Sequence, residues 1–327
     1  MIPLRDIRRR ISSVRRISHI TRAMKTVSAI RLMKVQTQVV KQKPYATKLR
    51  ELVSDLVQRT SGNLHPLLGQ PTADSSQLTA NSLQPQSAGR GPIVCLVLGS
   101  DRGLCGPFNN NLMAESLKFR AAREGREVHT VVFGKKLIDL MQSHRRPVTR
   151  RFTGFYQDMT YDKVAALARD YLQQYLAGRI GELWAVYTEF RSTARQKVKA
   201  EQILPIGVLK NDDLRITNDD SKKSPSFDIR HPTLPRAEPL FPEYVYEPDP
   251  FGVLDRLLPQ YYLREVWRIF LESTASEHMA RMLAMDMATI NAGDMIRDLT
   301  LTFNKARQES ITRELSEIST AAEAFRN

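Results

Sequence analysis

The residues most able to do chemistry lie in a glycine-rich stretch, Gly99-Ser-Asp-Arg-Gly-Leu-Cys-Gly106. It follows an apolar run and precedes a helical pattern, the position at which backbone N–H groups hold phosphate in many nucleotide-binding folds. Its spacing matches neither G-x-G-x-x-G nor G-x-x-x-x-G-K-[ST]. On spacing alone a tight structural turn is the favoured interpretation, with a nucleotide site as the alternative.

Histidine, cysteine and acidic residues are the other groups that could bind a metal or act in catalysis. The six histidines are scattered, and none forms a ligand pair at helical spacing. Cys95 and Cys105 are interpreted as two reduced thiols. Local sequence suggests no Ser/His/Asp, Cys/His or paired-carboxylate set. We therefore expect no catalytic residue, no bound cofactor and no metal.

Positive charge is concentrated at one end of the chain. Residues 1–50 contain fourteen lysines and arginines and one acidic residue, and so carry +13 of the net charge of +14. Such a segment suggests an acidic or polyanionic partner, nucleic acid among the candidates, although a solvated helix face is the commoner explanation. No aromatic residues are interleaved there, which argues against stacking on single-stranded nucleic acid.

The basic segment belongs to a long helix predicted over residues 1–60. Pro3 suits a first helical position, and Pro44 should kink the helix or end its first part. The mean spacing of the apolar residues is below 3.6, which favours a left-handed supercoil with another helix. The first of these residues are Leu4, Ile7, Ile11, Val14, Ile17, Ile20, Met24, Val27 and Ile30.

The middle of the chain has three parts. Residues 61–92 are rich in Ser, Gln, Pro and Gly and are predicted to form a flexible polar loop. Residues 93–206 alternate strand and helix patterns, from the apolar run Ile93–Leu98 onward, and predict an α/β domain with a mostly parallel sheet. Residues 207–249 form a proline-rich connection, with an edge strand expected at Tyr244-Val-Tyr246.

A second long helix is predicted over residues 250–327, beginning near Pro250 or Pro259. From Pro259 to Phe325 it would be roughly 100 Å long, which exceeds the diameter of a small domain. Apolar residues of its final turns follow the a/d steps of a coiled coil: Ile311, Leu315, Ile318, Ala322 and Phe325. The predicted fold class is therefore α/β plus α, a long antiparallel coiled coil of the two terminal helices on an inserted Rossmann-like α/β domain.

Several motifs resemble one family, the gamma subunit of F-type ATP synthase. They are Ile20-Thr-Arg-Ala-Met-Lys-Thr-Val-Ser-Ala29, Lys43-Pro-Tyr-Ala46, Ser100-Asp-Arg-Gly-Leu-Cys-Gly106, Ser276-Glu-His-Met-Ala-Arg-Met282 and Asn304-Lys-Ala-Arg-Gln-Glu-Ser-Ile-Thr-Arg-Glu-Leu315. They span the chain in the order found in the family, and their combination is highly specific.

The resemblance implies a rotor shaft without catalytic activity of its own. The coiled coil would enter the hexamer of alpha and beta subunits, and the α/β foot would sit on the membrane c-ring with the epsilon subunit. Nucleotide would be bound by the partners, and no nucleic acid would be involved. The chain would be peripheral, on the cytoplasmic face of a bacterial inner membrane or an equivalent energy-transducing membrane.

The resemblance also implies site residues. Those matching positions that contact beta-subunit loops or affect coupling are Met24, Lys25, Arg281, Arg307, Gln308, Thr312 and Glu317. Ile311, Leu315, Ile318 and Phe325 would form an apolar bearing tip. No dithiol insert of the chloroplast type is present, so thiol control is not predicted. Two other hypotheses stay open at this point, a basic coiled-coil nucleic-acid binder and a nucleotide-dependent enzyme built on the α/β domain.

Overall fold

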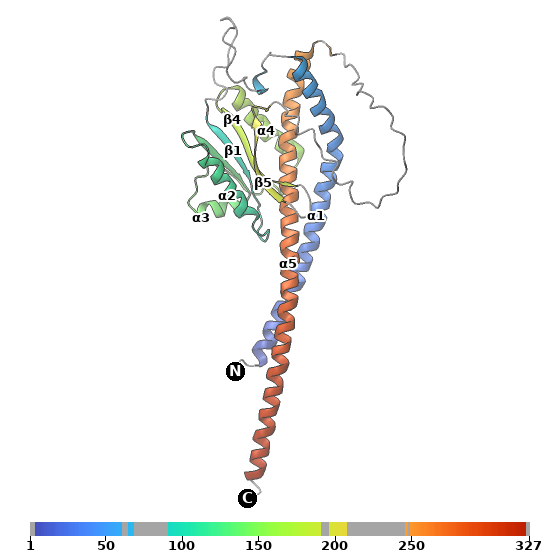
Figure 1. The fold of residues 1–327 in the computed structure, drawn as a ribbon, viewed down its shortest axis with the longest axis vertical. Helices are drawn as coiled ribbons and strands as arrows, with labels where there is room; N and C mark the ends of the chain where they lie inside the picture. The colour runs from blue at the N-terminus through green and yellow to red at the C-terminus, as the bar shows by residue number, and fades with distance from the viewer. Residues whose placement is uncertain are drawn as a thin grey trace, which may run out of the picture.

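Two long helices and a five-stranded sheet make up the computed structural model, which describes residues 4–60, 65–68, 91–190, 196–207, 246–247 and 249–324. Helix α1 covers Leu4–Arg59 and helix α5 covers Pro250–Ala324. The sheet and its helices flank the upper part of this helix pair, and the lower part projects away as a rod (Figure 1).

Helices α1 and α5 are antiparallel. Along α1 the residue numbers rise while the numbers of their partners on α5 fall, as three polar contacts show: Thr21 with Thr289, Lys25 with Asp286, and Arg50 with Glu265. The predicted pairing of the two ends of the chain is confirmed. The expectation that Pro44 could end the first helix is wrong, because α1 continues through it, and α5 likewise continues through Pro259.

The inserted domain is an α/β unit, as predicted. Its strands are β1 (Ile93–Leu98), β2 (Val128–Phe133), β3 (Arg150–Phe152), β4 (Glu182–Phe190) and β5 (Gln196–Leu204), in the spatial order β3-β2-β1-β4-β5. All neighbouring pairs are parallel except β4 and β5, which are antiparallel. Its helices are α2 (Phe108–Ala121), α3 (Lys135–Ser143) and α4 (Tyr161–Leu176).

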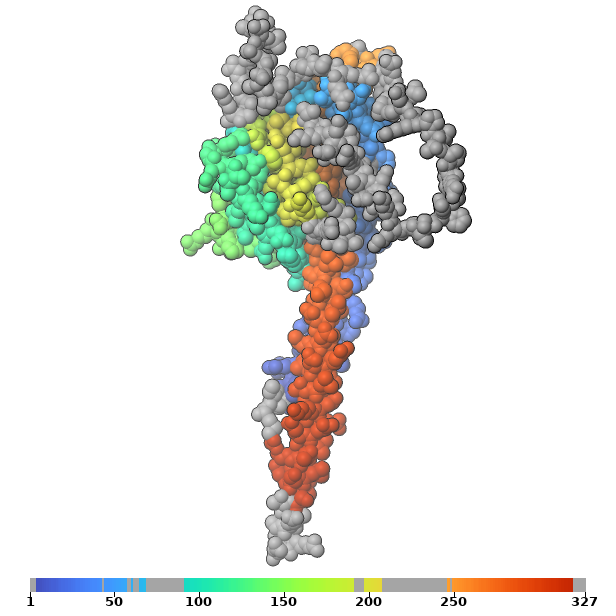
Figure 2. Space-filling model, viewed as in Figure 1, coloured from blue at the N-terminus to red at the C-terminus, as the bar shows by residue number. Residues whose placement is uncertain are grey.

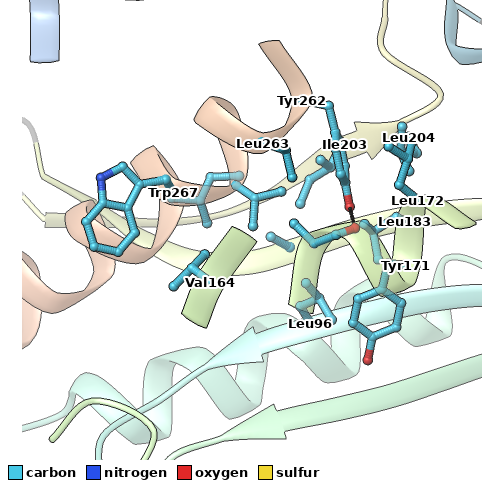
Figure 3. Packing of buried hydrophobic residues seen from close by; sticks show 14 of the residues in the cluster. Leu96, Val164, Tyr171, Leu172, Leu183, Ile203, Leu204, Tyr262, Leu263 and Trp267 are labelled. Atoms are coloured by element: carbon cyan, nitrogen blue, oxygen red, sulfur yellow. Dashed lines mark hydrogen bonds between the residues drawn. The ribbon is translucent and has the colours of Figure 1, made fainter. Parts of the chain in front are cut away.

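Both faces of the sheet are covered. Alternate residues of a strand point to opposite faces, and in β1 Cys95 and Val97 pack with α2 and α3. Leu96 and Leu98 pack on the other face with α4, α5 and α1. Figure 3 shows this second core, in which the Tyr262 hydroxyl of α5 donates to the Ala168 carbonyl of α4 at 3.0 Å. The shaft helix α5 is thus part of the core of the domain.

Part of the predicted loop 61–92 is ordered against this core. Residues Pro66–Leu68 form a 3-10 turn, and Leu67 is buried. The Ile206 N–H donates to the Leu67 carbonyl at 2.6 Å, and the Tyr175 hydroxyl donates to the Pro66 carbonyl at 3.2 Å. The prediction of a wholly flexible loop is wrong here, because one apolar side chain and two backbone carbonyls find partners. The stretch 224–242, and the edge strand expected at 244–246 apart from its last residue, lie outside the described residues.

Candidate partner-contact site

The residues expected to contact a partner are spread along the rod and form no single site. Met24 and Lys25 lie in the first half of α1, and Arg281 lies at the level of the α/β domain. From Arg281 to Arg307 the helix advances about 40 Å. The remaining residues, Arg307, Gln308, Thr312 and Glu317, are exposed on the last turns of α5.

Arg281 is not presented to a partner. Its side chain is buried and its Nη2 atom lies 2.6 Å from Oε1 of Glu277 on the same helix. The same guanidinium donates to the carbonyls of Arg102 and Gly103 at 3.1 and 3.2 Å. Because all of these partners belong to this chain, Arg281 joins the glycine-rich stretch to the shaft.

The glycine-rich stretch is a structural turn. The Gly99 N–H donates to the Phe133 carbonyl at 3.0 Å, and the Ser100 N–H donates to Oδ1 of Asn109 at 3.1 Å. Gly134, at a φ of 97°, passes so close that a Cβ there would lie 2.6 Å from the carbonyl carbon of Ser100. The first N–H groups that could hold a phosphate are therefore already bonded within the chain.

Asp101 fixes the turn to its surroundings. Its Oδ1 accepts from the backbone N–H groups of Lys135, at the start of α3, and Gly154, both at 3.0 Å. A carboxylate at a helix N-terminus also meets the positive end of the helix dipole. The Ser-Asp-Arg-Gly motif thus joins β1, α3, the segment after β3 and α5.

Met24 and Lys25 remain accessible. Met24 is half-buried, and Lys25 Nζ lies 2.6 Å from Oδ1 of Asp286, with both side chains about two-fifths exposed. An ion pair at that exposure is weak and exchangeable. A carboxylate from outside the chain could therefore compete for Lys25.

The apolar side chains at the end of α5 are not covered by any of the described residues. Ile311, Leu315 and Ile318 are 45%, 62% and 65% exposed, and the Thr312 hydroxyl donates to the Gln308 carbonyl of its own helix at 2.9 Å. Figures 1 and 2 show α5 extending past the start of α1. The coiled-coil seam predicted for these turns is not formed with α1. Phe325 and the side chain of Ala322 lie outside the described residues.

A partly buried ion cluster joins the shaft to the sheet, and sequence reasoning missed it. Arg268 of α5 donates to the carboxylates of Glu265, Glu272 and Glu201, the last of them on β5, at 2.7 to 2.8 Å. Burial disfavours ionisation of Glu201, but Arg268 and Lys199 outweigh it, so the pKa of this carboxyl is lowered. The spacing of Glu265, Arg268 and Glu272 could have indicated the helical part, while the contribution of β5 requires the fold.

Across the described ranges, no helix has a stretch long and apolar enough to cross a bilayer. The same part of the chain contains no group of three or more His, Cys, Asp or Glu residues that could hold a metal ion. Cys95 and Cys105 are free and buried, and burial raises the pKa of the Cys95 thiol to about 12.

Comparison with known proteins decides the family. A family model described as ATP synthase matches residues 3–325. The ATP synthase gamma chain of Anaeromyxobacter dehalogenans strain 2CP-C is 37% identical over 99% of this chain and 100% of its own length. This chain belongs to the ATP synthase gamma-chain family. The gamma chain of Chlorobaculum parvum, 33% identical over the full length of both chains, agrees with this.

Solved structures support the fold. A chain in the rotor of the Euglena gracilis mitochondrial ATP synthase is 19% identical, with a TM-score of 0.52, and the match covers 94% of this chain and 98% of that one. A second structure of the Euglena enzyme, described as OSCP/F1/c-ring, gives a TM-score of 0.56 over 98% of this chain and 94% of that one, again at 19% identity.

Family membership confirms the resemblance read from the motifs. As a gamma chain, the protein is the central rotor shaft of an ATP synthase and not one of its catalytic subunits. Of the three hypotheses, the rotor shaft is therefore the one that holds. The roles of individual residues along the shaft are a separate question.

Proposed function

We propose that the far end of α5 is a bearing that turns inside the hexamer of alpha and beta subunits of this ATP synthase. The observation that carries this proposal is the exposed apolar seam of Ile311, Leu315 and Ile318, which continues beyond the start of α1. Exposed apolar residues at such spacing require an apolar cover. Apolar contact is non-directional, so it can be exchanged as the shaft rotates.

The other end of the shaft must resist rotation relative to the foot. Arg268 bonds α5 to β5, Arg281 bonds α5 to the glycine-rich stretch, and Arg50 bonds α1 to α5. These directional contacts support a rigid connection, through which the foot passes torque from a membrane c-ring to the rod. The epsilon subunit is the second partner proposed for the foot.

The proposed contacts with beta-subunit loops fall at two levels. Met24 and Lys25 form the upper level, where the surrounding α1 surface is strongly basic and acidic loops would be attracted at long range. Arg307, Gln308, Thr312 and Glu317 form the lower level, where their exposure leaves them free to bond with a passing subunit. Arg281 would affect coupling only indirectly, through its hydrogen bonds to the glycine-rich stretch.

We place the assembled protein peripherally at an energy-transducing membrane, on the cytoplasmic face of a bacterial inner membrane or its equivalent. The membership of the chain in the gamma-chain family supports a peripheral position on a membrane-bound complex. The particular face is part of the proposal.

Replacing Met24 by lysine tests the upper level. The extra charge would add an ion pair with an acidic loop that must be broken as the shaft turns, so less of the energy of ATP hydrolysis would reach the membrane. ATP hydrolysis would then continue with reduced proton pumping in membranes. Met33→Lys is the matched control, because Met33 is also on α1 and is 66% exposed. Tightly coupled Met24→Lys enzyme would contradict the role given to Met24.

Replacing Ile311, Leu315 and Ile318 together by serine tests the bearing. The purified chain should unfold at nearly the same denaturant concentration as the parent, because these side chains have no cover within the described residues. ATP hydrolysis by the reassembled complex should fall. Unchanged hydrolysis at equal assembly would contradict the proposed bearing.

A further inference from the structure

A polar cavity of about 450 Å³ lies where the shaft meets the foot. Its walls come from α1, the glycine-rich stretch, residues 156–159 and α5. The volume falls within the range of about 300 to 1,000 Å³ found for small-molecule sites. None of the contacts with partner subunits proposed above involves this cavity.

Three cations surround the cavity. Arg31 and Lys34 come from successive turns of α1, and Arg102 comes from the glycine-rich stretch. In the part of the chain that the structure describes, none of the three side chains has a hydrogen-bonded or ion-pair partner. The carboxylates of Asp101 and Glu277 also line the cavity, but Asp101 accepts from backbone N–H groups and Glu277 accepts from Arg281. Converging cations that bond to neither carboxylate suit an anionic group, and phosphate is bound well by arginine and lysine together.

Two buried side chains from α5 supply groups of a different kind. Glu277 is 6% exposed; its Oε1 accepts from Arg281 at 2.6 Å, and its Oε2 makes no further hydrogen bond to any of the described residues. His278 is 9% exposed, and its Nδ1 lies 3.4 Å from Nη1 of Arg281. Because arginine is always a donor, this Nδ1 accepts, which leaves the His278 proton on Nε2.

The cavity therefore offers an acceptor and a donor on its α5 side, and three cations together with the carboxylate of Asp101 on the walls formed by α1 and the glycine-rich stretch. Glu277 Oε2 can accept a hydrogen bond and His278 Nε2 can donate one. A hydroxyl group both donates and accepts, so a hydroxyl-bearing ligand suits this pair. An anion alone would leave the acceptor of Glu277 unused.

We propose that this cavity binds a small phosphorylated compound with free hydroxyl groups, such as a sugar phosphate or a nucleotide. The phosphate lies among Arg31, Lys34 and Arg102, and a hydroxyl bonds Glu277 and His278. The ligand then touches α1, the foot and α5 together. Its binding stiffens the junction through which torque passes, and this is a role separate from the catalytic nucleotide sites of the complex.

Calorimetric titration of the purified full-length chain tests the proposal, since the isolated subunit lacks the nucleotide sites of its partners. The probes are ribose 5-phosphate, ADP and inorganic phosphate, each at physiological salt. We expect ribose 5-phosphate and ADP to bind, and inorganic phosphate to bind at least about tenfold more weakly, because it lacks the hydroxyl that bonds Glu277 and His278.

The variant Arg31→Gln/Lys34→Gln should raise the Kd for ribose 5-phosphate about tenfold or more, because two charge-assisted contacts are lost. The matched control is Arg22→Gln/Lys41→Gln, which removes the same charge from exposed positions of α1 outside the cavity. It should keep the parental Kd within about twofold. Both variants should melt at the parental temperature.

Three results would overturn the proposal. The first is that neither ribose 5-phosphate nor ADP binds. The second is an equal loss of affinity in the control variant, which would mean attraction to net charge alone. The third is inorganic phosphate binding as tightly as ribose 5-phosphate, which would reduce the cavity to a general anion site.

Discussion

The two ends of α5 are made of the same secondary structure but are held in opposite ways. Near its start, Leu254, Leu258, Tyr262 and Phe270 are fully buried in the foot. Near its end, every side chain from residue 311 to residue 319 is exposed. One continuous helix of 75 residues therefore joins the core of a domain to a free rod.

The difference between the two ends lies in the type of contact as well as its extent. The foot end makes directional bonds through Arg268 and Arg281 to β5 and to the glycine-rich stretch. At the free end, Thr312 bonds within its own helix, to the Gln308 carbonyl, and the apolar side chains are exposed. A shaft that must be fixed at one end and slip at the other needs this division.

Phe270→Ala should produce the largest effect on stability. Phe270 packs against the rings of Phe133 and Phe155, with ring centroids 5.2 and 5.4 Å away, and it is fully buried. Truncating such a ring leaves a cavity, so the free energy of unfolding should fall by about 3 to 5 kcal/mol. Urea unfolding of the purified chain measures it.

Leu315→Ala, at the other end of the same helix, is the control for this comparison. Leu315 is 62% exposed, so its loss should change the free energy of unfolding by less than about 0.5 kcal/mol. Comparable losses in the two variants would mean that the isolated chain covers its tip in solution, and the division between fixed and free ends would then be wrong.

Arg281→Met should have the next largest effect. It leaves Glu277 and the carbonyls of Arg102 and Gly103 without their donor. Burial already raises the pKa of the Glu277 carboxyl, so this group can take up a proton and limit the loss to about 2 to 3 kcal/mol. Urea unfolding should show this loss, and a loss below about 0.5 kcal/mol would mean that the foot holds the turn without Arg281.

Acid should weaken the fixed end through His278. Burial lowers the pKa of His278 to about 4, helped by Arg281, Arg31 and Arg102, against about 6.5 in an unfolded chain. Between these values the unfolded state binds the extra proton, so stability falls as pH falls. The free energy of unfolding should drop by about 2 kcal/mol from pH 7 to pH 5 on this account.

The variant His278→Gln isolates that contribution. The raised pKa of Glu277 acts in the opposite direction, since its contribution to stability is present at low pH and is lost as pH rises. Glu277 is present in both proteins, so the difference between their pH profiles reports His278. Parallel profiles between pH 7 and pH 5 would show that His278 titrates normally in the fold.

Much of the fold was predictable because its signals are local and repeated. The apolar run Ile93–Leu98 marked a buried strand, and the long proline-poor stretch after Pro259 marked the shaft. The turn Pro66–Leu68 was missed because its order comes from Leu67 entering a core made by distant elements. No composition rule reveals a single anchoring side chain within a polar segment.

The candidate site was less predictable than the fold. The motif containing Arg281 was recognised, but its side chain faces the chain's own glycine-rich stretch, and only the packing of α5 against the foot determines that. Arg268 and Glu201 are far apart in sequence and meet because β5 lies beside α5. Contacts between an inserted domain and a terminal helix produce no periodic pattern in the amino-acid sequence.

A small effect is also expected between the two ends, at the ion pair of Lys25 and Asp286. A double-mutant cycle with Lys25→Met and Asp286→Asn should give a coupling energy of about 0.2 to 1 kcal/mol, falling in high salt, because both side chains are substantially exposed. A weak pair leaves Lys25 free to exchange Asp286 for a carboxylate of a passing subunit. A coupling energy above about 2 kcal/mol, insensitive to salt, would mean that the Lys25–Asp286 pair is held as firmly as the contacts in the foot. Lys25 would then be unsuitable as a contact that is exchanged during rotation.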